Sequence, residues 1–91
     1  MITTTFRNKL NREFIEEYEE LAPRIEALAR SMPGFVSIKT FTEDDGERVS
    51  LVDFESWETM KAWCANSDHQ EAQRLGAARL YTEYSVISFE H

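Results

Sequence analysis

The side chains best suited to chemistry stand close together in one short segment, from Trp63 to His69. Histidine titrates near neutral pH, so His69 has the chemistry of a general base or of a group that orients a substrate. Trp63 offers a flat indole on which a planar molecule can stack. Both also suit structural roles, as a histidine bonded to a backbone carbonyl and a core tryptophan at helical spacing from Met60. The sequence leaves both interpretations open.

Three further residues carry groups that can hold a substrate. Arg7, near the end of an expected first strand, can bind a carboxylate or a phenolate, or can pair with a glutamate instead. Tyr18 and Tyr81 carry hydroxyls that can line a pocket, although tyrosines more often pack in a core or at a dimer contact. We retain all three as candidate substrate-binding residues.

Other kinds of site have little support in the sequence. Cys64 is the only cysteine, so it cannot form a disulfide within the chain, and a buried apolar role suits it better than a nucleophilic one. Asp44, Asp45 and Glu47 suit a hairpin turn better than a metal site. No glycine-rich phosphate loop or nucleotide-binding fingerprint is present. We therefore expect neither a metal nor a cofactor.

Composition narrows the range of partners. The 91 residues leave room for one domain, over 1–91, and a chain with 42% hydrophobic and 30% charged residues is typical of a folded globule. A formal net charge of −7 disfavours nucleic acid and anionic membranes as partners. No apolar run approaches the roughly 18 residues of a membrane span. The single cysteine and an N-terminus unlike a secretory signal favour the cytoplasm.

Hydrophobic periodicity predicts the element order β-α-β-β-α-β, a ferredoxin-like α+β fold with a four-stranded antiparallel sheet. Strands are expected where apolar and polar residues alternate, over 2–10, 35–42, 47–54 and 80–89. The turn at 43–46 ends in Asp-Gly, which tolerates the backbone geometry of a hairpin. The strands expected over 35–42 and 47–54 can therefore be joined directly by this tight turn.

Helices are expected between these strands. An apolar stripe at helical spacing predicts one long helix, and its members are Phe14, Tyr18, Leu21, Ile25, Leu28 and Met32. Pro23 lies inside this stripe and should kink the helix or split it in two. Ser56 can cap a short helix over 57–65, and Ser67 or Asp68 can cap another that Gly76 ends.

Apolar residues occupy both faces of the expected sheet. Along 35–42, strict alternation places Val36 and Ile38 on one side and Phe35 and Phe41 on the other. One chain has helices for only one face, so the other face should be covered by a second copy in an isologous homodimer.

Three segments resemble the family of antibiotic biosynthesis monooxygenases. They are MPGFVSIK at 32–39, DGERVS at 45–50, and AW at 62–63 followed by HQEAQ at 69–73. The resemblance covers nearly the whole chain with the motifs in order. It implies a dimeric α+β barrel, formed when two four-stranded sheets close on each other, with a pocket between each sheet and its own helices.

The resemblance carries over to single residues only in part. In the haem-degrading branch of this family, the position of the haem-ligating histidine is Gln73 here, a poor iron ligand. The same branch keeps an asparagine on its first strand near the place of Asn8, which makes Asn8 a candidate binding residue. In the branch that oxidises phenolic polyketides without a cofactor, a tryptophan and an asparagine are replaced here by Phe54 and Ser50.

The sequence leaves two functions open, and a third is less well supported. The first is a cofactor-independent monooxygenase acting on a small electron-rich aromatic molecule, a hydroquinone or an anthrone. His69 would be its base, Trp63 its stacking wall and Arg7 its anion partner. The alternative is a non-enzymatic dimeric module that binds a small apolar ligand in the same pocket. A haem-binding or haem-degrading role is the weaker third possibility.

Overall fold

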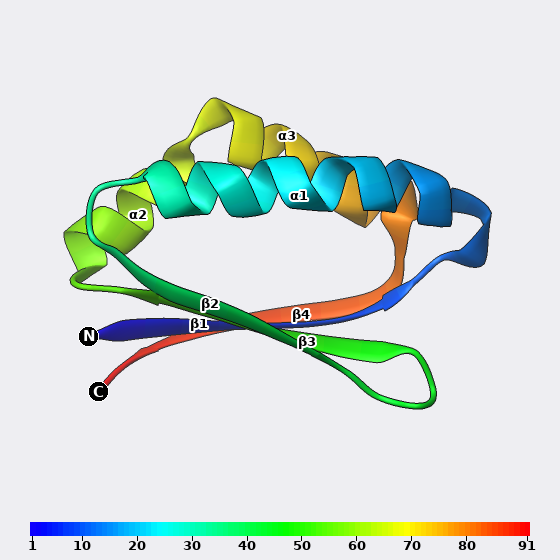
Figure 1. Cartoon of the computed structure of the whole chain (residues 1–91), viewed down its shortest axis with the longest axis horizontal. Helices are drawn as coiled ribbons and strands as arrows, with labels where there is room; N and C mark the ends of the chain where they lie inside the picture. Colours follow the sequence, from blue (N-terminus) through cyan, green and yellow to red (C-terminus); the bar gives the residue numbers. More distant parts are fainter.

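The computed structural model describes residues 1–91 and has a four-stranded antiparallel sheet with its helices on one face (Figure 1). The strands are β1 (Ile2–Leu10), β2 (Phe35–Thr42), β3 (Glu47–Phe54) and β4 (Tyr81–Glu90), in the order β2-β3-β1-β4. The helices are η1 (Arg12–Phe14), α1 (Ile15–Ser31), α2 (Trp57–Ala65), α3 (Ser67–Leu75) and a π-helical turn η2 (Gly76–Leu80). The predicted ferredoxin-like α+β fold is confirmed.

β1 lies inside the sheet and shows how the two faces differ. It pairs with β3 on one side and with β4 on the other. Ile2 is fully buried, and the Thr4 hydroxyl donates to Sδ of Met60 on α2 at 3.2 Å, so the even-numbered residues face the helices. Arg7, with the opposite parity, faces away from them.

The main core lies at the end of the molecule that holds the chain termini. Phe54 is fully buried and stacks on Trp63 of α2 with ring centroids 5.5 Å apart. Phe35 meets Phe54 edge to face at 5.9 Å. The core cluster consists of Ile2, Ala29, Val52, Phe54, Met60 and Trp63. None of the helices combines the length and apolar composition needed to cross a membrane.

β2 does not follow the strict alternation expected of it. The register with β3 shifts between Phe35 and Ser37, which leaves Val36 outside the ladder and 41% exposed. Because this bulge adds one residue, Phe35 and Ile38 both pack against the core, whereas Phe41 is exposed. The expected grouping of Val36 with Ile38 was therefore wrong.

Local signals fix most of the helix ends. α1 continues through Pro23 as one helix, so of the two expected effects, a kink or a split, the split does not occur. Ser56 begins α2 as predicted, with a capping box to Thr59. α3 is capped by Asn66 instead of Ser67 or Asp68, because the Asn66 side chain accepts from the backbone N–H groups of Asp68 and His69.

Gly76 ends α3, but its conformation is not the left-handed one that usually selects glycine at a helix end. Its φ is −58°, in the ordinary helical region. A Cβ at this position would lie 2.5 Å from Cε2 of Tyr81. That ring packs edge to face against Phe6 and Tyr18 and cannot easily move. Glycine is needed here because the Tyr81 ring occupies the space.

This contact makes Gly76→Ala a test of the packing. Helix propensity alone would make alanine more stable by about 1 kcal/mol. We expect instead a loss of about 1–3 kcal/mol in the free energy of unfolding, measured by urea denaturation, because the added methyl group overlaps the ring. In a Tyr81→Ala background the same change should be neutral or stabilising. Stabilisation in the otherwise unchanged protein would contradict the contact.

Candidate functional site

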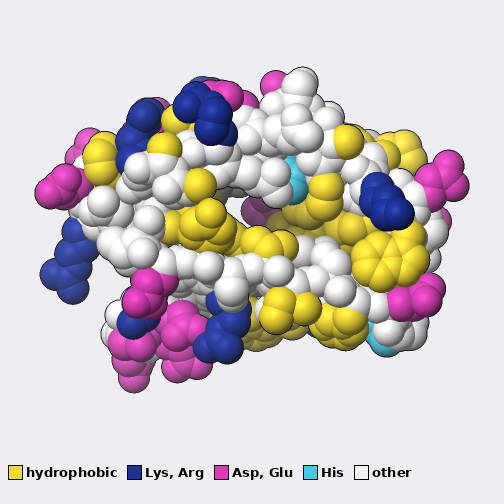
Figure 2. Space-filling model, turned by 180° about the vertical axis from the view of Figure 1, so that it is seen from behind, with side chains coloured by type: hydrophobic (Ala, Val, Ile, Leu, Met, Phe, Trp, Pro, Cys, Tyr) yellow, Lys and Arg dark blue, Asp and Glu magenta, His cyan; other side chains and the backbone are white.

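A hollow opens between the helix layer and the sheet, with hydrophobic side chains on its floor (Figure 2). The exposure of the strands shows where the helices leave the sheet uncovered. Val52 on β3 faces the helices and is only 4% exposed. Val86 and Tyr84 on the edge strand β4 have the same orientation, since they pair with Phe6 and Asn8, yet they are 50% and 53% exposed. The hollow therefore lies over β1 and β4.

Four aromatic rings surround the end of the hollow near the start of α1. The Tyr81 ring lies 5.3 Å from that of Phe6, 6.2 Å from that of Tyr18 and 6.3 Å from that of Tyr84, centroid to centroid. Burial raises the pKa of Tyr81 to about 12, so its hydroxyl stays protonated at neutral pH. Burial also raises the pKa of Tyr18, in part offset by Arg48. Such rings suit a planar, apolar ligand.

His69 of α3 lies flat against the indole of Trp63, with ring centroids 3.9 Å apart and an interplanar angle of 14°. Its Nδ1 is 3.2 Å from the backbone oxygen of Trp63. Because a carbonyl oxygen can only accept, Nδ1 carries the proton and Nε2 keeps a free lone pair. Burial lowers the pKa of His69, with the bond to Trp63 opposing the shift, so the ring is neutral at pH 7. This is the protonation state that a general base requires.

Two buried polar atoms on elements that face the interior have no hydrogen-bond partner in the protein. They are Oδ1 of Asn8, an acceptor on β1, and Nε1 of Trp63, a donor on α2. Both residues are at most 5% exposed. Leaving a buried polar atom unpaired costs about 1–3 kcal/mol, so native proteins rarely keep one without a reason. A ligand hydroxyl can donate to Oδ1 of Asn8, and a ligand hydroxyl or carbonyl oxygen can accept from Nε1 of Trp63.

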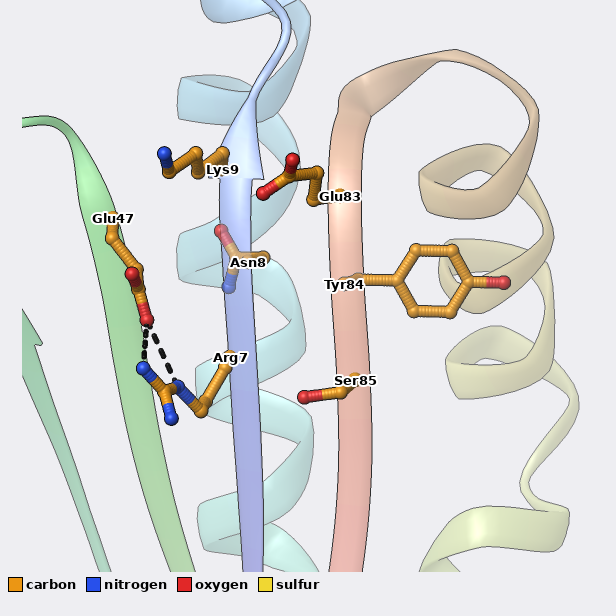
Figure 3. A pocket seen from close by; sticks show the side chains of 7 residues that line it. All are labelled: Arg7, Asn8, Lys9, Glu47, Glu83, Tyr84 and Ser85. Carbon is orange, nitrogen blue, oxygen red and sulfur yellow. Dashed lines mark hydrogen bonds and ion pairs between the residues drawn. The ribbon is translucent and has the colours of Figure 1, made fainter.

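Arg7 is not brought together with the other candidates. It lies on the face of the sheet that has no helices, where its guanidinium pairs with Glu47 of β3 (Figure 3). The two side chains border an open, mostly polar depression of about 320 Å³ on that face. The sequence allowed for this pairing with a glutamate, and the structure places Arg7 across the sheet from the aromatic hollow.

Sequence reasoning missed Arg48, whose guanidinium carbon lies 4.5 Å from the ring centroid of Tyr18. It belongs to β3 and pairs across the sheet with Asn8, on the helix-facing side. The alternation along β3 could have identified it, because Arg48 has the same parity as the buried Val52 and Phe54. A charged residue at an inward position of a strand is a candidate binding group.

The remaining candidates are easily placed. Gln73 lies on α3 and is exposed. Cys64 is half-buried, and burial raises the pKa of its thiol, which disfavours the reactive thiolate. No three side chains of His, Cys, Asp or Glu lie together in an arrangement that could hold a metal ion.

Comparison with known proteins agrees on one family. The sequence pattern of the antibiotic biosynthesis monooxygenases matches residues 1–75. An uncharacterised protein of Bacillus subtilis, YqjZ, is 30% identical over 69 residues, which make up 76% of this chain and 60% of YqjZ. The chain therefore spans less than two thirds of that relative's length.

Solved structures share the fold at much lower identity. SnoaB of Streptomyces nogalater, a cofactor-independent oxygenase, superimposes with a TM-score of 0.83 at 17% identity, covering 99% of this chain and 91% of its own. Rv0793 of Mycobacterium tuberculosis has a TM-score of 0.85 at 13% identity, with 99% and 93% covered. At these identities the similarity concerns the fold.

The buried His69 makes a prediction about stability and pH. Its pKa is lower in the folded protein than the unfolded value of about 6.5, so the unfolded chain takes up the proton first on acidification. We expect the free energy of unfolding to fall as the pH drops below about 6.5.

Urea denaturation between about pH 8 and 5.5, above the range in which most carboxylates titrate, measures this effect. The matched variant is His69→Phe, which keeps a ring against Trp63 but cannot titrate. Its pH dependence should be the weaker of the two. Equal slopes in both proteins would show that His69 is not held neutral by the fold.

Proposed function

The chain belongs to the antibiotic biosynthesis monooxygenase family, and on that premise we propose that it is a cofactor-independent monooxygenase. The proposed substrate is a small electron-rich aromatic molecule of the hydroquinone or anthrone type. The observation that carries the proposal is a neutral, buried imidazole on a helix bordering a hollow with aromatic walls. SnoaB, which shares the fold, is itself a cofactor-independent oxygenase.

In this proposal His69 is the general base. Its free Nε2 lone pair takes a proton from the substrate, and the resulting carbanion or phenolate is electron-rich enough to react with O₂. One oxygen atom enters the product, and the other leaves as water with the two hydrogens that the substrate loses. The substrate supplies all the electrons, so the overall reaction balances without an added reductant.

The remaining groups orient the substrate and exclude water. The rings of Phe6, Tyr18 and Tyr81 provide flat apolar walls. The indole of Trp63 cannot serve as a stacking wall, because Phe54 and His69 cover its two faces. The unpaired Oδ1 of Asn8 can accept a hydrogen bond from a substrate hydroxyl. Arg7 has no part in this arrangement, because it lies on the opposite face of the sheet.

Oxygen uptake without any added cofactor tests the proposal, over a panel of hydroquinones and anthrones. We expect uptake above the autoxidation of each substrate, and a fall of at least about 100-fold in kcat for His69→Ala, since a general base contributes roughly 10²–10⁴. His91→Ala is the matched control, because His91 lies at the end of the chain, bonded to Thr3.

Two results would count against the oxygenase. Unchanged turnover in His69→Ala would remove His69 as the base. No uptake over the whole panel, with a probe molecule still bound in the hollow, would favour the non-enzymatic binding module. A haem-related role would require hemin to bind, which a spectral titration measures directly.

We also propose that the helix-free face of the sheet is covered by a second copy of the chain. Phe41, Ile87 and Phe89 lie on this face and are 58%, 62% and 46% exposed. Ile87 pairs with Thr5, which also pairs with Leu51, so apolar side chains of β4 and β3 flank Thr5 of β1 on this face. The charged Arg7 and Glu47 on this face neutralise each other. With a single cysteine, a reducing compartment such as the cytoplasm suits this dimer.

The mass in solution tests this interface. We expect light scattering at micromolar concentration to give twice the 10.6 kDa of one chain. Ile87→Asp should weaken association by at least about 100-fold, because it would bury an unpaired charge. Ala78→Asp, at an exposed position of η2, is the control. A monomer for the unaltered protein would overturn the dimer.

A further inference from the structure

We propose that Arg48, with Asn8 and Tyr18, forms a subsite for an anionic oxygen at one end of the hollow. The ligand would then be an aromatic molecule that carries a carboxylate or a phenolate. This inference rests on the proposed function only in using the same hollow. It is argued from the position of Arg48, from its lack of an ion-pair partner and from the groups around it.

The side chain of Arg48 points into the space between the sheet and the helices. Arg48 has the same parity along β3 as Val52 and Phe54, which are buried against the helices. Its guanidinium reaches across to α1, where it lies over the ring of Tyr18. Arg48 itself is only partly exposed. It is therefore a cation on the concave side of the fold and not on the outer surface.

No acidic side chain neutralises this cation. The five ion pairs of the structure use Arg7, Lys9, Arg30, Arg74 and Arg79. Arg48 makes no ion pair, although the chain has 17 acidic residues against 10 basic ones. Apart from its contact with Tyr18, an inward arginine without an ion pair has N–H donors available for a ligand.

The neighbours of Arg48 suit an anion on an aromatic frame. Tyr18 holds the guanidinium through a cation–π contact and is itself packed against Tyr81, so the cation is fixed in place. Asn8 lies directly opposite Arg48 in the sheet, with a buried and unpaired Oδ1. The fork of an arginine binds a carboxylate or phenolate, while the asparagine accepts from an adjacent hydroxyl.

The subsite also has a consequence for the reaction. An arginine at the ionised oxygen stabilises the deprotonated substrate, so it would act together with the base and not through it. Arg48 is therefore a substrate-binding residue of the hollow. The rings of Phe6 and Tyr84 lie near Tyr81 and provide the apolar surface for the rest of the molecule.

Binding of two matched probes tests the subsite without any turnover. Naphthoate and its neutral methyl ester differ only in the charged oxygen. We expect the unaltered protein to bind naphthoate at least about tenfold more tightly than the ester, and Arg48→Met to bind both alike. Arg30→Met is the matched control, since Arg30 also lies over an aromatic ring, that of Phe35, outside the hollow.

A second probe separates a phenolate ligand from a carboxylate. The ionisation of para-nitrophenol is visible by its colour, and binding beside Arg48 should lower its apparent pKa in the unaltered protein and in Arg30→Met, but not in Arg48→Met. Selectivity for naphthoate alone would assign the subsite to carboxylates. A shift of the phenol alone would assign it to phenolates.

Either of two outcomes would overturn the proposal. In the first, the unaltered protein binds naphthoate and its ester with equal affinity and leaves the apparent pKa of para-nitrophenol unchanged. In the second, the preference for naphthoate over the ester persists in Arg48→Met. Thermal unfolding and the ester affinity show whether the variant is folded, and Arg48→Lys, which keeps the charge but loses the fork, should retain part of the preference. An anion preference that depends on Arg48, in a protein without oxygen uptake, would uphold the subsite and reject the oxygenase.

Discussion

The rest of the structure depends on one geometric constraint, which is that the sheet is wider than the helix layer that covers it. α1 and α2 bury the inner side of β3, where Val52 and Phe54 are at most 4% exposed. The same side of β4 remains half-open, because β4 is an edge strand and the helices beside it do not close down on it (Figure 2). The uncovered strip becomes the hollow. A fully covered sheet of this size would have a larger core and no room for a ligand.

That constraint also explains the placing of polar groups. Asn8, Arg48 and Trp63 all belong to elements that face the interior. Asn8 and Trp63 each keep a buried polar atom without a partner, and Arg48 makes no ion pair. In a closed core such unpaired polar groups would lower the free energy of unfolding and could bind no ligand. Around a hollow they remain available to a bound molecule. His69 follows the same pattern, since the bond to the Trp63 carbonyl uses one ring nitrogen and leaves the other free.

The sequence predicted most of the fold because its signals are local. Helical spacing, the Ser56 capping box and the Asp-Gly turn each act within a few residues, and each appears where expected. Gly46, for example, has a φ of +90° in the hairpin turn. The faces of β2 were wrongly predicted because the bulge at Val36 depends on the pairing of β2 with β3, which is distant in the sequence. The cap of α3 was wrongly predicted at Ser67 or Asp68, although the Asn66 cap is a local contact.

For the candidate site, the sequence by itself determined the chemistry that is available: a histidine near a tryptophan, several tyrosines, and arginines on two strands. The tertiary structure decided which of these lie together. Arg7 and Arg48 are both strand arginines, but their parity in neighbouring strands places one against Glu47 on the outer face and the other over Tyr18 on the inner face. The spare lone pair of His69 likewise depends on a bond across six residues. Register and packing fix such contacts, and no local pattern contains them.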